Sequence, residues 1–454
     1  MHAFNTVVAT AVALASTAYH ISLVSAGPVD NNLLSRNPFP QAAPALAAVP
    51  TACPGVPAIS FPFQVASGWA ATKVAGNLTL PRGIVVDTQG RLLMVQNGIG
   101  ISQHILTSGG CIQSSRVLIA QTNLNHGIYL SPNGTTLYAS SPTTVWSWTY
   151  DPASGNVLGS YTVLVTGMVN SGHITRTLII PPHAPNLLLV AHGSNGNVDA
   201  AAVNPATARA VVRVFDLSNL PSGGYNYVTQ GYLMGYGLRN EVALAFDGNN
   251  MPGSLPGDDF QRTVNGVTTD IHQDNPAEEL NYLGDVTVPN NNWYGYPVCY
   301  TVWQPSLITD RVFAPGDQFV AAPNSTFNDT TCIQQSQPAH MIFQSHNAPI
   351  DSKFDATFSN LFITLHGSWD RQPAAGFRLV SVPFAQNSAG AYVPTAATNS
   401  TSGWQDILYQ ADPSNCSGTT CIRPAGLAFV AGGNLYMTSD NQREGELFLV
   451  GRVG

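Results

Sequence analysis

GHITRTLIIPPHAPNLLLVAHGSN, residues 172–195, is the stretch of sequence that decides the fold. Its segments Thr177–Ile180 and Leu187–Ala191 are short, apolar and bounded by turn residues, so each is predicted to be a β-strand. The Pro- and Asn-containing segment between them predicts a turn. His173 and Arg176 precede the first strand, so the pattern places two ionisable side chains at one end of a strand pair.

Five further segments repeat this strand–turn–strand layout. They are Leu80–Gln96, Leu124–Ser140, Gly237–Asn250, Lys353–Arg371 and Cys421–Ser439. The six copies follow one another at spacings of roughly 44 to 70 residues, except for one long insertion, residues 251–343, before the fifth copy. Repeats of this size are typical of radial arrays, so we predict an all-β fold, a six-bladed β-propeller that spans residues 53–454.

A basic or amide residue recurs where the copies enter their first strands. The residues at or just before this position are Arg82, His126, Arg176, Arg239 with the adjacent Asn240, and Arg423. In a propeller, these strand entrances converge on one end of the central channel. Because the chain has only 17 Lys and Arg among 454 residues, this convergence would gather several of its few cations. We therefore expect a functional site at that end.

The composition excludes a nucleic-acid surface, and the N-terminus predicts secretion. The net charge is -8 and only 9% of residues are charged, whereas nucleic-acid binding requires basic patches. Residues 4–24 form a largely apolar run that leads into Val24, Ser25 and Ala26, small residues of the kind that signal peptidase recognises. We predict a signal peptide over residues 1–26 and a flexible leader over residues 27–52. A membrane anchor is the alternative, but polar residues within the run make it a poor bilayer span.

The cysteines and glycosylation sequons agree with this prediction. Six Asn-x-Ser/Thr sequons occur, at Asn77, Asn133, Asn324, Asn328, Asn399 and Asn415. The six cysteines lack the spacing of a metal site and allow fifteen disulfide connectivities. Pairing in chain order gives Cys53–Cys111, Cys299–Cys332 and Cys416–Cys421. We expect a secreted, extracellular glycoprotein that is a monomer without membrane association.

A succession of motifs carries the functional signal. The sequence has no Rossmann fingerprint, P-loop, zinc-protease helix or Gly-x-Ser-x-Gly elbow, so hard chemistry would require another kind of cofactor. The motifs present are GHITRTL at 172–178, YGLRNEVALAFD at 236–247, EELN at 278–281, NNWYGYP at 291–297, HGSWDR at 366–371 and CIRPAGLAF at 421–429. In this order they resemble the soluble pyrroloquinoline quinone (PQQ) sugar dehydrogenases. The chain is most similar to their secreted fungal pyranose dehydrogenase branch, related to sorbosone dehydrogenases, over nearly all of residues 80–454.

The resemblance implies a six-bladed propeller with PQQ in the channel mouth and Ca²⁺ on the quinone. It makes His173 the catalytic base and implies that Arg371 polarises the quinone. The PQQ-binding residues that it implies are Arg239, Asn240 and Arg423. The backbone oxygens of Gln273 and Asp274 are expected to hold Ca²⁺. Family members can carry a cytochrome domain and a cellulose-binding module, which this sequence lacks, so we expect a separate haem protein or small molecule as electron acceptor.

Several other residues keep two possible roles. Arg82 and His126 either contact the cofactor or brace neighbouring blades and turns, and the same choice applies to Arg176. Aromatic side chains near the motifs, Trp293 and Trp369, either stack on sugar or quinone or belong to the core. The acidic residues Asp216, Asp258 and Asp259 are either solvated turn residues or ligands of a second calcium ion.

The implied cofactors suit the residue types. PQQ carries three carboxylates, and Arg stays charged and pairs with carboxylates in a bidentate manner. Hard oxygen ligands suit Ca²⁺. A neutral His, with an ordinary pKa near ~6.5, can take the proton from the anomeric hydroxyl of a reducing sugar while hydride leaves the same carbon. The product would be a lactone.

Two other classes of function compete with this hypothesis. A calcium-dependent lactonase propeller would require a ring of Glu, Asn and Asp side chains on the metal. The strand entrances carry mostly Arg and His instead, and guanidinium repels a metal ion. A non-catalytic carbohydrate-binding propeller would need neither the cations nor a base, and it would turn over no dye.

Overall fold

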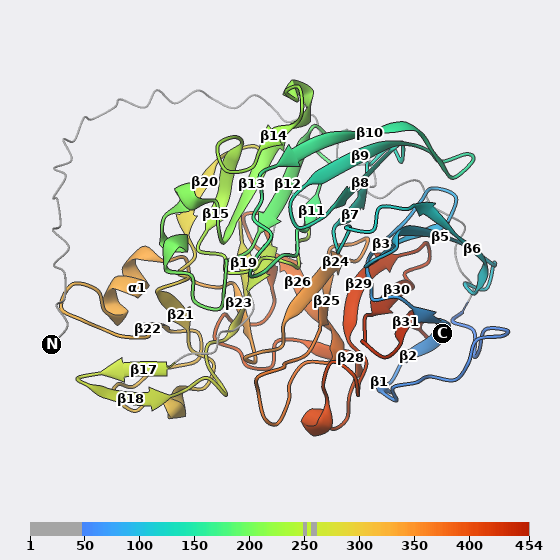
Figure 1. Ribbon diagram of the computed structural model, residues 1–454. Helices are drawn as coiled ribbons and strands as arrows, with labels where there is room; N and C mark the ends of the chain where they lie inside the picture. Colours follow the sequence, from blue (N-terminus) through green and yellow to red (C-terminus); the bar gives the residue numbers. More distant parts are fainter. Residues whose placement is uncertain (1–47, 248–251, 256–260, 454) are drawn as a thin grey trace, which may run out of the picture. The chain divides into compact units, whose positions relative to one another are not determined.

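The computed structural model describes residues 48–247, 252–255 and 261–453 (Figure 1). The predicted signal peptide, most of the leader, and Asp258 and Asp259 lie outside these residues. Of the predicted leader, Val49 packs in an apolar cluster of the propeller, and Thr72 donates a hydrogen bond to the Pro50 carbonyl. Within the described residues, no helix is long and apolar enough to span a bilayer.

Three sheets follow one another in the first part of the chain. The first contains β3 (Pro81–Val86), β4 (Leu92–Gln96), β5 (Gly100–Leu106) and β6 (Ile112–Ile119). The second contains β7 (Ile128–Leu130), β8 (Thr136–Ser140), β9 (Val145–Asp151), β10 (Asn156–Thr166) and β14 (Tyr225–Asn226). The third contains β11 (Leu178–Ile179), β12 (Leu187–His192), β13 (Val211–Asp216), β15 (Tyr232–Tyr236) and β20 (Asn290–Trp293).

Three further sheets complete the repeats. The fourth contains β16 (Pro252–Leu255), β19 (Glu278–Tyr282) and β23 (Met341–Phe343). The fifth contains β24 (Pro349–Phe354), β25 (Asn360–Leu365), β26 (Arg378–Gln386), β27 (Tyr392–Pro394), β28 (Gln405–Tyr409) and β1 (Gln64–Val65). The sixth contains β29 (Pro424–Phe429), β30 (Leu435–Ser439), β31 (Gly445–Arg452) and β2 (Trp69–Leu78). This organisation confirms the predicted all-β propeller.

The first strands of the sheets, β3, β7, β11, β24 and β29, run next to one another in the middle of the propeller (Figure 1). Glycine permits this close approach, because a Cβ at Gly83 would lie 2.3 Å from the His126 carbonyl oxygen. A Cβ at Gly127 would lie 2.3 Å from the Arg176 carbonyl oxygen. The entrances at His126 and Arg176 therefore each contact the start of the preceding repeat.

Hydroxyl groups of neighbouring sheets bond carbonyls near the strand entrances. The donors and acceptors are Thr438 Oγ1 to Arg82 O at 2.9 Å, Ser140 Oγ to Arg176 O at 2.6 Å, Thr177 Oγ1 to Val242 O at 2.6 Å and Thr364 Oγ1 to Ala425 O at 2.6 Å. These bonds satisfy carbonyl groups that the strand ladders leave unpaired. Together with the glycine contacts, they bring the entrances of successive repeats to the same end of the strands.

Strand β2, from the N-terminal part of the propeller, closes the ring by pairing with β31 near the C-terminus. Lys73 on β2 is buried and forms ion pairs of 2.8 Å with both Glu444 and Glu446. The disulfide between Cys53 and Cys111 ties the segment before β2 to the first sheet.

The fourth repeat differs from the prediction. Residues 241–247, within the predicted strand–turn–strand copy Gly237–Asn250, form no strand ladder, although Val242 and Leu244 are buried. The strands of this repeat are β16, β19 and β23, so the predicted insertion 251–343 contains the sheet itself. Apolar residues of β19 and β23 explain this arrangement, because Leu280, Met341 and Phe343 pack in one cluster with the fifth sheet.

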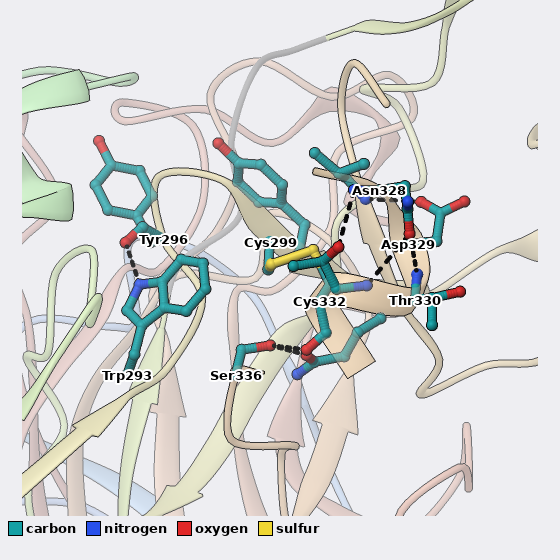
Figure 2. The surroundings of a disulfide bond; sticks show 12 residues. Trp293, Tyr296, Cys299, Asn328, Asp329, Thr330, Cys332 and Ser336 are labelled. Carbon is teal, nitrogen blue, oxygen red and sulfur yellow. Dashed lines mark hydrogen bonds between the residues drawn. A yellow bond between two sulfur atoms is a disulfide. The ribbon is translucent and has the colours of Figure 1, made fainter. Parts of the chain in front are cut away.

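The rest of the insertion forms a small subdomain. It contains β17 (Gln261–Val264) with β18 (Val267–Asp270), β21 (Cys299–Thr301) with β22 (Gln318–Val320), and α1 (Asp329–Gln335). The disulfide Cys299–Cys332 joins β21 to α1, and the Asn328 side chain caps the helix by accepting hydrogen bonds from the Thr330 and Thr331 amides (Figure 2).

The structure confirms all three disulfides predicted from chain order, Cys53–Cys111, Cys299–Cys332 and Cys416–Cys421. The sequon asparagines lie in accessible places. Asn328 is half-buried at the cap of α1, and the other five are exposed: Asn77, Asn133, Asn324, Asn399 and Asn415.

Candidate active site

His173 lies before β11. Ser194, two residues after the end of β12, holds it in place. The His173 N–H donates to the Ser194 carbonyl at 2.9 Å. Its ring Nδ1 lies 2.8 Å from Ser194 Oγ and 3.3 Å from Ser194 O. Gly193 allows this approach, because a Cβ there would be 2.6 Å from His173 Cβ. The backbone thus fixes the imidazole at the end of the third sheet.

Burial lowers the pKa of His173 to about 4, and the positive charges of Arg239 and Arg176 add to this effect. Its hydrogen bond to the Ser194 carbonyl opposes the shift. The ring is therefore neutral at pH 7, which is the form that a general base requires.

Arg239 and Asn240 lie beside His173. The Ser194 amide donates to the Arg239 carbonyl at 2.7 Å, and Arg239 Nε donates to the Asn197 carbonyl at 3.1 Å. A Cβ on Gly193 would also lie 2.7 Å from Asn240 Oδ1. These residues and His173 form one group, which we call the base cluster: His173, Ser194, Arg239 and Asn240.

A second group joins Arg82, Arg423 and His126 through residues that the sequence did not single out. Arg82 Nη1 pairs with Asp440 at 2.6 Å, and His366 Nε2 lies 2.5 Å from the other oxygen of Asp440. Arg423 Nη2 lies 2.7 Å from His366 Nδ1. Because a guanidinium can only donate, Nδ1 of His366 accepts and Nε2 carries the proton toward Asp440. We call this group the arginine cluster: Arg82, His126, His366, Arg423 and Asp440.

Charges in the arginine cluster are strongly coupled. Burial lowers the pKa of His366 to about 4, and Arg423 adds to this effect while Asp440 opposes it. Burial alone would raise the pKa of Asp440, but His366 and Arg82 lower it below its usual range. One carboxylate therefore partly balances two guanidinium groups, which leaves the cluster net positive.

His126 differs from His173 in its hydrogen bond. Arg82 Nε donates to His126 Nδ1 at 3.3 Å, so the lone pair of that nitrogen is already engaged. Burial and the Arg82 charge hold the pKa of His126 well below its ordinary value. His126 is therefore a neutral neighbour of Arg82, and its contact with that side chain supports the arginine cluster.

A cavity of about 890 Å³ opens beside these groups. Arg82, Arg423, His366 and Asp440 line it, and so do residues 174 and 175, which follow His173 directly. Asn125 also lines it, and this side chain has a buried Oδ1 with no hydrogen-bond partner among the described residues. The volume suits a cofactor or a small ligand, since pockets of this kind typically measure ~300–1,000 Å³.

Arg176 is structural rather than a ligand contact. It is fully buried, and its guanidinium donates to four backbone carbonyls, those of Pro142, Val169, His173 and Thr175. Of the two roles left open for this residue, the structure shows bracing of the neighbouring repeat.

The predicted calcium loop and Arg371 lie together. Arg371 Nη2 pairs with Asp274 Oδ1 at 2.5 Å, and the Gln372 amide donates to Gln273 Oε1 at 2.9 Å. Arg371 Nε is buried without a hydrogen-bond partner among the described residues. Neither the loop nor Arg371 lines the cavity, so these three residues form a separate group on the fourth and fifth repeats.

The remaining candidates divide between core and surface. Trp293 is nearly buried, and its Nε1 donates to the Tyr296 carbonyl at 3.1 Å, as Figure 2 shows, so it belongs to the core. Trp369 is 75% exposed. Asp216 caps the short 3₁₀ turn that follows β13 by accepting from the Ser218 amide, in agreement with a turn role.

Ser194, His366 and Asp440 were missed by the sequence analysis. The pairing of β11 with β12 opposes Leu178 to Val190 and Ile179 to Leu189, so continuing this register would have placed residue 194 near His173. His366 stands in the HGSWDR motif, but a single histidine beside a strand is a weak signal. Asp440 contacts Arg82 across 358 positions, which no local pattern reveals.

Comparison with known proteins gives the family. The TrAA12-like family profile matches residues 63–453. A relative from Coprinopsis cinerea, named pyrroloquinoline quinone-dependent pyranose dehydrogenase, is 42% identical over 412 residues, 88% of this chain and 56% of that protein. The chain thus spans little more than half the length of this relative.

Two solved structures are also similar. The holo form of the pyranose dehydrogenase PQQ domain from C. cinerea superimposes with a TM-score of 0.85 and 41% identity, covering 88% of this chain and 100% of that one. The calcium structure of a Trichoderma reesei carbohydrate-active enzyme of family AA12 gives a TM-score of 0.81 and 35% identity, covering 87% and 98% of the two chains. The chain belongs to the TrAA12-like family.

Proposed function

We propose that this protein is a PQQ- and Ca²⁺-dependent dehydrogenase that oxidises reducing pyranoses at the anomeric carbon to lactones. The observation that carries the proposal is the cavity lined by Arg82 and Arg423, together with the neutral, half-buried His173 that directly precedes its lining residues 174 and 175. The printed names of the relatives, a PQQ-dependent pyranose dehydrogenase and a calcium structure of family AA12, support the same choice of cofactors.

The arginine cluster fits PQQ. It holds two guanidinium groups but one carboxylate, Asp440, which pairs with Arg82 while Arg423 bonds His366, so the net positive charge would favour an anionic cofactor. The cavity of about 890 Å³ can accept a molecule of that size together with part of a sugar. Arg82 and Arg423 would bind its carboxylates, and Arg239 and Asn240 would contact it from the base cluster.

The loop at Gln273 and Asp274 fits Ca²⁺ in the type of ligand. Backbone carbonyl oxygens are hard donors of the kind that Ca²⁺ prefers. The side chain of Asp274 is already paired with Arg371, which leaves the carbonyl oxygens as the candidate ligands. Arg371, whose buried Nε has no hydrogen-bond partner among the described residues, lies outside the cavity lining and would act from the side of the calcium loop.

The protein's own side chains accept the proton and bind the sugar. When bound, PQQ with Ca²⁺ would supply the two-electron acceptor for the anomeric hydride. His173 takes the proton of the anomeric hydroxyl, so the C–H and O–H bonds of the sugar break and a C=O bond forms. Its low pKa keeps the ring unprotonated before each turnover. The unpaired Asn125 Oδ1 in the cavity can accept a hydrogen bond from another sugar hydroxyl.

We also propose that the protein is secreted as a monomeric glycoprotein and that a separate haem protein or small molecule receives its electrons. Three disulfides and five exposed sequon asparagines support secretion, because disulfides persist in oxidising compartments.

The test is a dye-reduction assay of the apoprotein with reducing sugars, run with neither cofactor, with PQQ alone, with Ca²⁺ alone and with both. We expect turnover only with both cofactors, and saturable PQQ binding in a titration. No turnover of any sugar together with no PQQ binding would exclude the dehydrogenase.

The lactonase alternative has a weaker basis. Among the described residues, no group of three or more His, Cys, Asp or Glu side chains could hold a metal ion. Lactone hydrolysis by the PQQ-free protein in the presence of Ca²⁺ would nevertheless favour it, and sugar binding without any turnover would favour a carbohydrate-binding propeller.

A further inference from the structure

Ser194 makes contacts that restrict the protonation of His173. It is completely buried, and its backbone links the two parts of the base cluster, by donating to Arg239 O and accepting from the His173 amide. Its side-chain oxygen lies 2.8 Å from the Gly196 carbonyl and 2.8 Å from His173 Nδ1. These two short contacts determine where the hydrogen atoms lie.

A serine hydroxyl has one hydrogen to donate, and a carbonyl oxygen can only accept. The hydroxyl of Ser194 donates to Gly196 O, which also accepts a longer hydrogen bond of 3.3 Å from the Tyr296 hydroxyl. Its lone pair then faces His173 Nδ1, and the second atom near Nδ1, Ser194 O at 3.3 Å, is also only an acceptor. Both neighbours accept, so the proton of the neutral ring is on Nδ1 and the lone pair is on Nε2.

Because the charges around His173 are positive, an uncharged hydrogen-bond partner keeps its imidazole neutral. The charged groups that shift the pKa of this ring are Arg239 and Arg176, and both are positive. A carboxylate in place of Ser194 would raise the pKa of the imidazole and favour its protonated form. A hydroxyl orients the ring without adding charge, so it fixes the tautomer while the base stays neutral.

We propose that Ser194 is a positioning residue that holds His173 in the Nδ1-protonated tautomer, so that Nε2 is the atom that accepts the sugar proton. The inference rests on the proposed function, and it assigns one residue and one atom within it. His126, at the entrance of the preceding repeat, accepts a hydrogen bond from Arg82 Nε at Nδ1 and is held in the opposite tautomer.

The first experiment needs neither cofactor nor sugar. Imidazole ¹⁵N shifts are measured at pH 7 in apoprotein labelled at histidine, and His173 is assigned by the signal that His173→Gln removes. We expect a protonated Nδ1 and a bare Nε2. A proton on Nε2 in the wild-type protein overturns the inference, whether or not the protein oxidises sugars.

Two substitutions then connect the tautomer to turnover. Ser194→Ala removes the acceptor, and we expect mixed tautomers and a kcat lower by on the order of 10-fold with little change in KM. Ser194→Asp keeps an acceptor, so the tautomer should persist while the acidic limb of the pH profile moves to higher pH. Ser381 is a buried serine on β26, so Ser381→Ala controls for the loss of volume. It should leave the tautomer, kcat, KM and the pH profile unchanged.

The outcomes separate the two proposals. If the wild-type protein has no sugar oxidation with PQQ and Ca²⁺, the proposed function fails, but the tautomer measurement still stands on its own. If the wild type is active and Ser194→Ala matches it in kcat, in ¹⁵N shifts and in pH profile, Ser194 does not position the base. If Ser194→Ala does not fold, the wild-type tautomer and the Ser194→Asp pH profile decide.

Discussion

His173 lies five residues before β11 and His126 two residues before β7, and their surroundings give them different chemistry. Ser194 faces Nδ1 of His173 with acceptors, whereas Arg82 donates to Nδ1 of His126. Low pKa alone does not distinguish a base, since burial also lowers the pKa of His104 on β5 to about 4. The hydrogen-bond partner and the neighbouring cavity, rather than the pKa, single out His173.

The pH profile should report the low pKa of His173. A histidine whose pKa is lowered keeps its base form at lower pH, so kcat/KM should hold from neutral pH downward and fall as the pH passes through about 4. The measurement is the initial rate of dye reduction by the holoenzyme at subsaturating sugar. An acidic limb near the ordinary histidine value of ~6.5 would contradict the assignment.

Arg423 should contribute to PQQ affinity. A hydrogen bond to a charged group contributes about 1.5–3 kcal/mol, so Arg423→Met should weaken PQQ binding by roughly 10-fold to 100-fold. The affinity is measured by titrating the apoprotein with PQQ. Arg116→Met is the matched control, because Arg116 lies on the outer strand β6 and should leave the affinity unchanged. Equal affinities for the two variants would remove Arg423 from the site.

At the scale of elements, one buried arginine anchors the subdomain of the long insertion. Arg262 on β17 pairs with Asp310 at 2.7 Å and with Asp329, at the start of α1, at 2.9 Å. Its guanidinium also lies over the Phe319 ring of β22, with 5.7 Å to the centroid. The subdomain depends on these contacts and on the Cys299–Cys332 disulfide, since its regular structure among the described residues is two short strand pairs, one 3₁₀ turn and one short helix.

Arg262→Met should loosen this subdomain. It leaves Asp329 buried without its main cation, and breaking a buried pair in this way costs about 3–5 kcal/mol. We expect faster hydrogen exchange and proteolysis within residues 261–335. Arg311→Met is the control, because Arg311 is exposed and 3.6 Å from Asp329, an interaction that contributes about 0–1 kcal/mol. Similar exchange rates in both variants would show that Arg262 is not the anchor.

The strand pattern of the sequence predicts the repeats well, but it does not predict the contacts between repeats. The segments around Leu178 and Leu187 are strands as expected, because apolar runs between turn residues have a local cause. Residues 241–247 have the same pattern and form no ladder, since strands β16, β19 and β23 pair with each other instead. Asp440 and Ser194 escaped prediction because long-range folding brings them to Arg82 and His173.

At the scale of the whole molecule, the propeller depends on joining its two ends. β2 completes the sheet that contains β31, so the N-terminal and C-terminal parts unfold together if the ladder opens. The Lys73 ion pairs with Glu444 and Glu446 lie within this closure. The arginine cluster also spans it, because Arg82 belongs to the first repeat and Asp440 to the last.

The disulfides should differ in their contribution to stability. Cys53 and Cys111 are 58 positions apart, and a loop of that length corresponds to about 4 kcal/mol of chain entropy. Cys416 and Cys421 are 5 positions apart, which corresponds to about 2 kcal/mol. Denaturant unfolding of the two double Cys→Ser variants should therefore show the greater loss for the first. The reverse order would contradict a role for Cys53–Cys111 in closing the ring.

The most direct test of the central claim, that His173 is the base of a PQQ-dependent sugar dehydrogenase, is kcat for dye reduction by His173→Gln loaded with PQQ and Ca²⁺. General-base catalysis contributes typically about 10²–10⁴-fold, so kcat should fall by that factor while PQQ affinity in a titration stays that of the wild type. His104→Gln, which removes another buried histidine with a pKa of about 4, should keep its activity. A His173→Gln protein that binds PQQ and turns over sugar at the wild-type rate would contradict the account.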